Sequence, residues 1–169
     1  MILALTAAVI FGFMAIEARR AALNERMQRA AGGIEPPGDV YSLMRLAYPS
    51  AFVAMIVEAA VRGGAPAIVA GFGIAVFAAA KALKWWAIVT LGGAWTFRVI
   101  VVPGRRRIRM GPYRFLNHPN YVAVVGELLG AALMCGAVLT GPAATAFFLV
   151  LMLKRIAVEN RAVATHLHS

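Results

Sequence analysis

Charged residues are scarce in this chain and make up 14% of its 169 residues, against roughly 25% in soluble domains. Hydrophobic residues make up 62%, which excludes an ordinary soluble domain. The short alternating apolar segments of an outer-membrane barrel are also missing, because the apolar residues form runs of about the 20 residues that a helix needs to cross a bilayer. We therefore expect an all-α integral membrane protein.

Cysteine is almost absent, and this removes two further classes. The single Cys135 lies in an apolar run, so we expect neither a disulfide framework nor a metal site. The net charge of +10 would suit nucleic acid, but the arginines stand at the ends of apolar runs and form no separate basic domain. The expected partner of this charge is the lipid bilayer, and we expect no nucleic acid.

Apolar runs predict a bundle of five transmembrane helices, at residues 2–16, 43–61, 67–89, 119–139 and 143–158. No basic residue precedes the first run, so we interpret it as a span and not as a cleaved signal peptide. The charged segment 17–39 ends in glycine and proline, which predicts a surface helix followed by a turn. We interpret Lys81 and Lys84 as snorkelling side chains.

The distribution of arginines predicts the orientation. A separate helix over 85–102 would place the arginine cluster of 105–109 opposite the arginines of 19–29, against the positive-inside rule. One helix over 67–89 followed by a cytoplasmic loop over 91–118 removes this conflict. The N-terminus is then outside, and the loop and the C-terminus are cytoplasmic. Arg45 and Glu58 are too far apart to form a local pair, so we expect contacts between helices or at helix ends.

One polar segment separates the long apolar regions, Gly111 to Tyr121, which reads Gly-Pro-Tyr-Arg-Phe-Leu-Asn-His-Pro-Asn-Tyr. Pro119 suits the first position of a helix, because its missing amide proton is not needed there. The free amides and the dipole at that helix start favour an anion. Taken alone, His118 would be a helix cap. Trp95 and the two tyrosines would be aromatics of the membrane interface.

In its later part the chain resembles the isoprenylcysteine carboxyl methyltransferase family, whose wider group includes phospholipid methyltransferases. The resemblance covers about 67–163 and rests on Leu91-Gly92, Trp95-Thr96, Gly104, Gly111-Pro112-Tyr113, Asn117-His118-Pro119-Asn120-Tyr121 and Arg155-Ile-Ala-Val-Glu159-Asn160. It implies S-adenosylmethionine as the cofactor and a lipophilic small-molecule or prenylated acceptor. The residues assigned to the cofactor are His118, Tyr121, Tyr113, Pro119, Gly111 and Trp95. Among these, the rings of Tyr113 and Trp95 would pack on the adenine.

Three residues are candidates for catalysis. Arg155 and Glu159 are four apart on a predicted helix, so they can form an ion pair, and the resemblance places their equivalents around the methyl acceptor. Arg155 would hold or polarise the acceptor oxygen, and Glu159 would orient the acceptor or the cofactor amine. Glu127, within the fourth span, is either a hydrogen-bonded packing residue or a group that faces the acceptor.

Two departures from the family pattern concern the acceptor: Asn117 and Asn160 stand where the family usually has arginine and glutamate. The short segment after Glu159 also predicts less cover over the cofactor than in relatives with a soluble tail. A carboxylate acceptor is already ionised at neutral pH, whereas a phenol with a pKa near 10 needs a base, and both remain open.

The sequence thus predicts an O-methyltransferase with two parts, residues 1–66 with two helices and a connector, and a core of 67–169 that includes a hairpin at 119–165. The alternatives are a phospholipid N-methyltransferase, an NADPH enzyme similar to sterol reductases, and a membrane scaffold without catalytic activity.

Overall fold

The computed structural model describes residues 2–105 and 108–166, and in this part of the chain the long elements are five α-helices. They are α1 (Ile2–Ala30), α2 (Tyr41–Arg62), α3 (Ala67–Leu91), α4 (Pro119–Cys135) and α5 (Thr140–His166). Two short 3-10 helices, Gly92–Ala94 and Gly111–Arg114, lie between α3 and α4. Arg106, Arg107 and the side chain of Asn160 lie outside what the structure describes.

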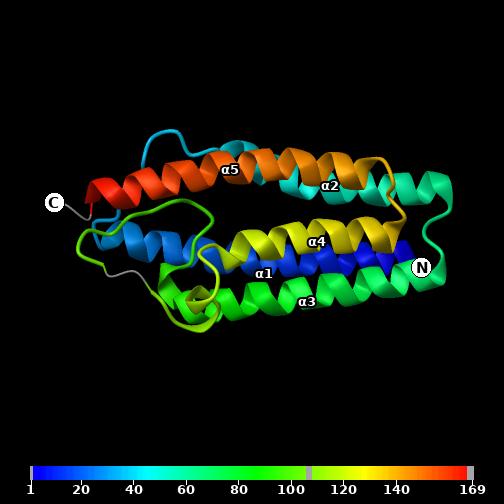
Figure 1. Ribbon diagram of the computed structural model, residues 1–169, viewed down its shortest axis with the longest axis horizontal. Helices are drawn as coiled ribbons and strands as arrows, with labels where there is room; N and C mark the ends of the chain where they lie inside the picture. Colours follow the sequence, from blue (N-terminus) through cyan, green and yellow to red (C-terminus); the bar gives the residue numbers. More distant parts are fainter. Residues whose placement is uncertain (1, 106–107, 167–169) are drawn as a thin grey trace.

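Figure 1 shows the helices side by side along one axis. The α1–α2 connector, the long α3–α4 segment and the C-terminus lie at one end of the bundle, and the N-terminus and the other two turns lie at the opposite end. Shorter than its neighbours, α4 begins part-way along the bundle, with the α3–α4 segment reaching in to meet it. Polar connections from distant parts of the sequence therefore meet beyond the start of α4.

The predicted helix order is confirmed, including one helix over all of 67–89 and a helix that begins at Pro119. The separate surface helix predicted within 17–39 is wrong, because α1 continues without a break to Ala30. Residues 13–31 contain no proline or glycine that would end it. One face of this extension is also buried, through Glu17, Asn24 and Gln28, so it is not a surface helix.

Three helical stretches are long and apolar enough to cross a membrane, namely Tyr41–Arg62, Ala67–Ala94 and Thr140–Glu159. The apolar helix Pro119–Cys135 is shorter, with 17 residues. These counts apply to the described part of the chain. The three candidate spans support a membrane protein. The sequence prediction of five spans claims two more than these helices show.

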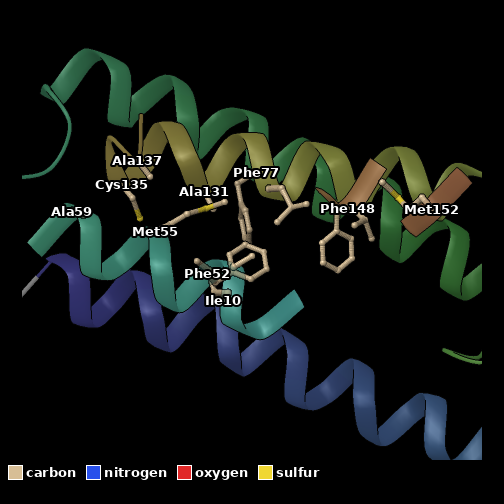
Figure 2. Packing of buried hydrophobic residues seen from close by; sticks show 13 residues of the cluster. Ile10, Phe52, Met55, Ala59, Phe77, Ala131, Cys135, Ala137, Phe148 and Met152 are labelled. Atoms are coloured by element: carbon tan, nitrogen blue, oxygen red, sulfur yellow. The ribbon is translucent and has the colours of Figure 1, made fainter. Parts of the chain in front are cut away.

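The apolar core draws on all five helices. Figure 2 shows Phe52 of α2, Phe77 of α3 and Phe148 of α5 in the space between the helices, with Ile10 of α1 close to Phe52. Leu128 of α4 completes this cluster and is fully buried. The core thus fixes α4 among all the other helices and sets the position of its first turn.

Helices α3 and α4 approach each other closely, through glycine. A β-carbon on Gly130 of α4 would lie 2.6 Å from the backbone nitrogen of Phe77 in α3, and one on Gly73 of α3 would lie 2.5 Å from the nitrogen of Met134. Small residues allow this approach in membrane helices, where packing and not water exclusion holds helices together.

Replacing Gly130 with alanine is expected to destabilise the bundle, because the new methyl group would force α3 and α4 apart. Overpacking of this kind costs about 1–3 kcal/mol, and thermal unfolding in detergent measures it. Gly71→Ala on α3 is the control: a β-carbon there meets nothing within 4 Å, and alanine favours the helix by roughly 0.5–1 kcal/mol. Equal effects of the two variants would contradict the close approach.

A network of four buried charges joins α1, α3 and α4. Glu17 of α1 lies 2.8 Å from Lys81 and 2.7 Å from Lys84, both on α3, and Glu127 of α4 lies 3.1 Å and 3.3 Å from the same two lysines. The hydroxyl of Tyr48 in α2 donates a hydrogen bond to Glu127. All four charged side chains are at most 7% exposed. The snorkelling interpretation of Lys81 and Lys84 is therefore wrong, because both lysines face inward to carboxylates.

Lys81→Met is expected to lower the free energy of unfolding by about 3–5 kcal/mol, because it leaves two buried carboxylates with one cation. Lys154→Met, at an exposed position of α5, is the matched loss of a lysine and should change it by less than about 0.5 kcal/mol. Thermal or denaturant unfolding in one detergent compares them. Similar stability of the two variants would refute a structural role for the network.

Glu58 provides the inter-helix contact expected of it. Its carboxylate accepts hydrogen bonds from the backbone nitrogens of Leu139 and Thr140 at 3.0 Å and 2.8 Å, and from the Thr140 hydroxyl at 2.6 Å. These donors stand at the start of α5, where unpaired amides and the helix dipole favour a negative charge. Glu58 thereby ties the end of α2 to the α4–α5 turn.

Candidate functional site

A cavity of about 450 Å³ lies beyond the start of α4, within the usual size range of ligand pockets. Its walls come from α1, α2 and α5, from the first turn of α4, and from residues 94–101 of the α3–α4 segment. Five of the six residues predicted to hold the cofactor line it, and so do two of the three predicted catalytic residues. These seven residues are Trp95, Tyr113, His118, Pro119, Tyr121, Arg155 and Glu159.

His118 precedes Pro119 at the start of α4, but its side chain makes no capping hydrogen bond. The imidazole instead stacks on Tyr121, with ring centroids 5.3 Å apart. Its Nδ1 lies 3.7 Å from the Glu159 carboxylate, which also accepts a hydrogen bond of 3.1 Å from the Tyr121 hydroxyl. The motif on α4 and the end of α5 therefore form one polar cluster, and His118 occupies the N-cap position without capping the helix through its side chain.

The first-turn amides of α4 are mostly occupied. Those of Tyr121 and Val122 donate to the carbonyl of His118, at 3.1 Å and 3.3 Å. Pro119 has no amide proton, so in the described structure Asn120 is the residue of this turn whose N–H remains for an anion. The start of α4 therefore offers fewer free backbone amides to an anion than the sequence predicted.

Arg155 is buried and faces the α1–α2 connector and the α3–α4 segment. Its guanidinium donates to the carbonyl of Phe97, lies 3.9 Å from the carboxylate of Asp39, and contacts the sulfur of Met44 at 3.8 Å. Spacing along α5 permits an ion pair between Arg155 and Glu159, but the structure gives the two side chains different partners. Both side chains line the cavity.

Three residues that line the cavity carry a buried polar atom with no hydrogen-bond partner in the described part of the chain: Trp95 at its indole nitrogen, Asn120 at its amide oxygen and Arg155 at its Nε. A buried polar group without a partner costs about 1–3 kcal/mol, so such groups point to a ligand that satisfies them. Two donors and one acceptor suit a molecule that carries both an amine and a carboxylate or ring nitrogens. This set fits S-adenosylmethionine, and no sequence signal singled out Asn120.

Trp95 is 2% exposed and packs with Ala21 of α1 and Ile88 of α3. Its ring also meets Phe97 edge-on at 5.2 Å. The interfacial-belt interpretation of Trp95 is therefore wrong, since protein surrounds the ring. Tyr113 is partly buried, and burial followed by the charge of Glu159 raises the pKa of its phenol well above the usual range. The Tyr113 hydroxyl therefore stays protonated at neutral pH and can donate a hydrogen bond.

Two predicted site residues do not line the cavity. Gly111 lies against α3, where a β-carbon would come within 2.4 Å of the Thr90 hydroxyl, so it fixes the position of Tyr113 and does not face a ligand. Glu127 is 1% exposed and belongs to the buried charge network. It adjoins the cavity only through Tyr48 and Lys84, which do line it.

The connector between α1 and α2 holds the α3–α4 segment in place. Ile34 pairs with Val101 in an isolated antiparallel bridge, and Asp39 accepts a hydrogen bond of 3.2 Å from the backbone nitrogen of Val99. Arg98 lies 2.6 Å from Glu35. Burial raises the pKa of Glu35, but the hydrogen bonds from Arg98 and Arg29 outweigh burial and leave the pKa below its usual value. Glu35 therefore stays ionised and holds Arg98.

Sequence reasoning missed the share of the N-terminal helices in this site. Tyr41, Met44, Arg45 and Tyr48 of α2 line the cavity together with Glu17 of α1. Arg45, Pro49 and Glu58 indicate from the sequence that the second span faces protein or a cavity along part of its length, but they do not show that this cavity is the predicted cofactor site.

Fold and site together define a helical membrane protein with a polar pocket at one end of its bundle. Residues 73–165 match the isoprenylcysteine carboxyl methyltransferase (ICMT) family, which is just over half of the chain, and the chain belongs to this family. Membership implies a membrane methyltransferase.

Two relatives extend over most of the chain. YpbQ of Bacillus subtilis (strain 168), described as uncharacterized, is 30% identical over 157 residues, which are 92% of this chain and 93% of the relative. An uncharacterized protein of Haemophilus influenzae (strain ATCC 51907 / DSM 11121 / KW20 / Rd) is 25% identical over 142 residues, 83% of each chain. No solved structure matches the chain.

Proposed function

We propose that this protein is an S-adenosylmethionine-dependent O-methyltransferase that acts on a lipophilic acceptor where the membrane meets the cytosol. The observation that carries the proposal is that the family motif lines one cavity, together with three residues, Trp95, Asn120 and Arg155, that each carry a buried polar atom without a hydrogen-bond partner among the described residues. Family membership supports methyl transfer.

The cofactor side of the cavity is formed by the first turn of α4 and the α3–α4 segment. The amide oxygen of Asn120 would accept from the cofactor's amino group, and the N–H of Asn120 would donate to its carboxylate. The indole N–H of Trp95 and the rings of Tyr113 and His118 would bind the adenine. Bound there, S-adenosylmethionine supplies a sulfonium methyl group whose sulfur–carbon bond breaks as the acceptor oxygen attacks in line.

The acceptor side is formed by α5. The Nε–H of Arg155 has no hydrogen-bond partner among the described residues, and Arg155 would hold the acceptor oxygen. A carboxylate acceptor brings no proton to remove. A phenol would pass its proton to Glu159, because the carboxylate of Glu127 is already held by Tyr48 and two lysines.

We also propose five spans, with the N-terminus outside and the cavity cytoplasmic. The alternating helix directions of Figure 1 support this topology, because they bring the α1–α2 connector, the α3–α4 segment and the C-terminus to one end. Arginines of that end, such as Arg26, Arg29, Arg105 and Arg109, would then lie on the cytoplasmic side.

Calorimetric titration of the detergent-purified protein with S-adenosylhomocysteine tests the function. We expect binding to the wild-type protein and a loss of at least about tenfold in His118→Ala, the factor that corresponds to about 1.4 kcal/mol, because the imidazole forms part of the cavity wall. Phe115→Ala is the control, since that side chain lies in the same segment but is exposed and should leave binding unchanged.

The same titration separates the other classes. Binding of NADPH in place of S-adenosylhomocysteine would indicate a reductase. Binding of neither by a protein shown to be folded would indicate a scaffold. Methylation of a phosphatidylethanolamine and of no oxygen acceptor would indicate a phospholipid N-methyltransferase.

A further inference from the structure

The turn that precedes α4 carries large apolar side chains on the protein surface. Met110 and Phe115 border the 3-10 helix Gly111–Arg114, with Leu116 next to them. Phe115 is 75% exposed and Met110 is 67% exposed. Tyr113, which lies between them in the sequence, lines the cavity instead. The turn therefore has one side that belongs to the proposed site, and it has exposed apolar side chains that the described part of the chain does not cover.

This turn rests on the end of α3. Gly111 makes a close contact, because a β-carbon there would lie 3.1 Å from the indole nitrogen of Trp86. Trp86 and Val89 are three residues apart, so they lie on one face of α3, and both are exposed. Figure 1 shows the turn between the last turns of α3 and the start of α4. We name the five exposed apolar side chains the outer patch: Trp86, Val89, Met110, Phe115 and Leu116.

The outer patch lies near one end of a helix that can cross a membrane. The stretch Ala67–Ala94 is long and apolar enough to do so. At a rise of 1.5 Å per residue, Trp86 lies about 28 Å along α3 from Ala67, and the hydrocarbon core of a bilayer is about 30 Å thick. A helix that enters the bilayer near Ala67 therefore leaves it near Trp86. This places the outer patch at the depth where acyl chains meet headgroups, and tryptophan is enriched at that depth.

Two arginines border the outer patch without a counter-charge. Arg109 and Arg114 are exposed, and the guanidinium carbon of Arg114 lies 5.9 Å from the ring centroid of Phe115. The chain has seven acidic residues, and each lies next to another basic side chain: Glu17, Glu25, Glu35, Asp39, Glu58, Glu127 and Glu159. Within residues 2–105 and 108–166 neither Arg109 nor Arg114 has an acidic partner. The patch thus combines apolar side chains with uncompensated positive charge.

We propose that the outer patch, together with Arg109 and Arg114, is a docking surface for an anionic phospholipid. The apolar side chains contact the acyl chains, and the two guanidinium groups hold the phosphate of the headgroup, as in segments that lie in a membrane interface. An acidic protein partner fits this surface less well, because the patch continues onto the apolar face of α3. The turn before α4 is then an interfacial anchor and not a loop in the cytosol.

Fluorescence quenching by brominated phospholipids tests the proposal in the whole chain reconstituted into bilayers. Bromine on an acyl chain quenches a tryptophan only at close range, and Trp86 lies in the outer patch. The Trp86→Phe variant gives the background from the other two tryptophans of the chain. Brominated phosphatidylglycerol is expected to occupy the site next to Trp86 in about tenfold preference over brominated phosphatidylcholine. The reason is that each arginine near an anionic surface contributes a factor of about five.

Arg114→Gln is expected to lower this preference about fivefold, and Arg109→Gln/Arg114→Gln to remove it, while quenching by phosphatidylcholine stays unchanged. Arg114→Lys keeps the charge and should retain most of the preference. Lys154→Gln is the matched control, because Lys154 is an exposed cation of α5, which lies on the opposite side of the bundle from α3 (Figure 1). Equal preference in the double variant and the wild type, or an equal loss in Lys154→Gln, would overturn the proposal.

A second reporter separates the turn from the helix. Phe115→Trp in the Trp86→Phe background places an indole on the turn itself, at an exposed position, and brominated phosphatidylglycerol should quench it. Quenching at position 86 and none at position 115 would show that α3 meets the lipid and the turn does not, which refutes the docking surface.

Inorganic phosphate and chloride at matched ionic strength form the last arm. If phosphate removes the preference for phosphatidylglycerol and chloride does not, the two arginines bind the free ion and lipid docking is wrong. Circular dichroism of each variant shows that an observed loss does not come from unfolding. None of these outcomes depends on the binding of S-adenosylhomocysteine, so the proposed function is tested separately.

Discussion

The rest of the structure depends on the pairing of four charges inside an apolar bundle. A charged side chain at this depth is costly unless it is paired, and the two carboxylates of Glu17 and Glu127 meet this cost only if both face Lys81 and Lys84. This pairing fixes how far α1, α3 and α4 are shifted along their axes relative to one another. With Tyr48 bonded to Glu127, α2 joins the same arrangement, and the first turn of α4 is held at a fixed depth in the bundle.

The depth of α4 explains why a cavity exists at this end. Because α4 starts below the ends of its neighbours (Figure 1), its first turn faces a space that α5, α1 and the α3–α4 segment enclose. The segment has little regular structure of its own, and the α1–α2 connector holds it through the Ile34–Val101 bridge and through Asp39 and Glu35. Asp39 also lies near Arg155, so one carboxylate positions both the segment and a proposed catalytic side chain.

The sequence predicted the features that depend on neighbouring residues. Pro119 marked the start of α4, and the polar motif around His118 identified most of the residues that the structure brings to the cavity. It failed for Lys81, and for Trp95 it left the membrane interface open beside the cofactor site, because the choice between the interface and the interior depends on a partner far away in the chain. For Lys81 that partner is Glu17, and for Trp95 it is the packing against Ala21 and Ile88. Periodicity does not reveal such contacts, and it also gave no sign that the amide oxygen of Asn120 is buried without a partner.

The two parts of the cavity wall have different relations to the family. Residues 73–165, which match the family, contain Trp95, His118, Asn120 and Arg155, and these would hold the cofactor and the reacting oxygen. The α2 wall, with Arg45 and Tyr48, lies outside this match. The family match therefore identifies the reaction, and the acceptor has to be argued from the chemistry of the whole cavity wall, to which α2 also contributes.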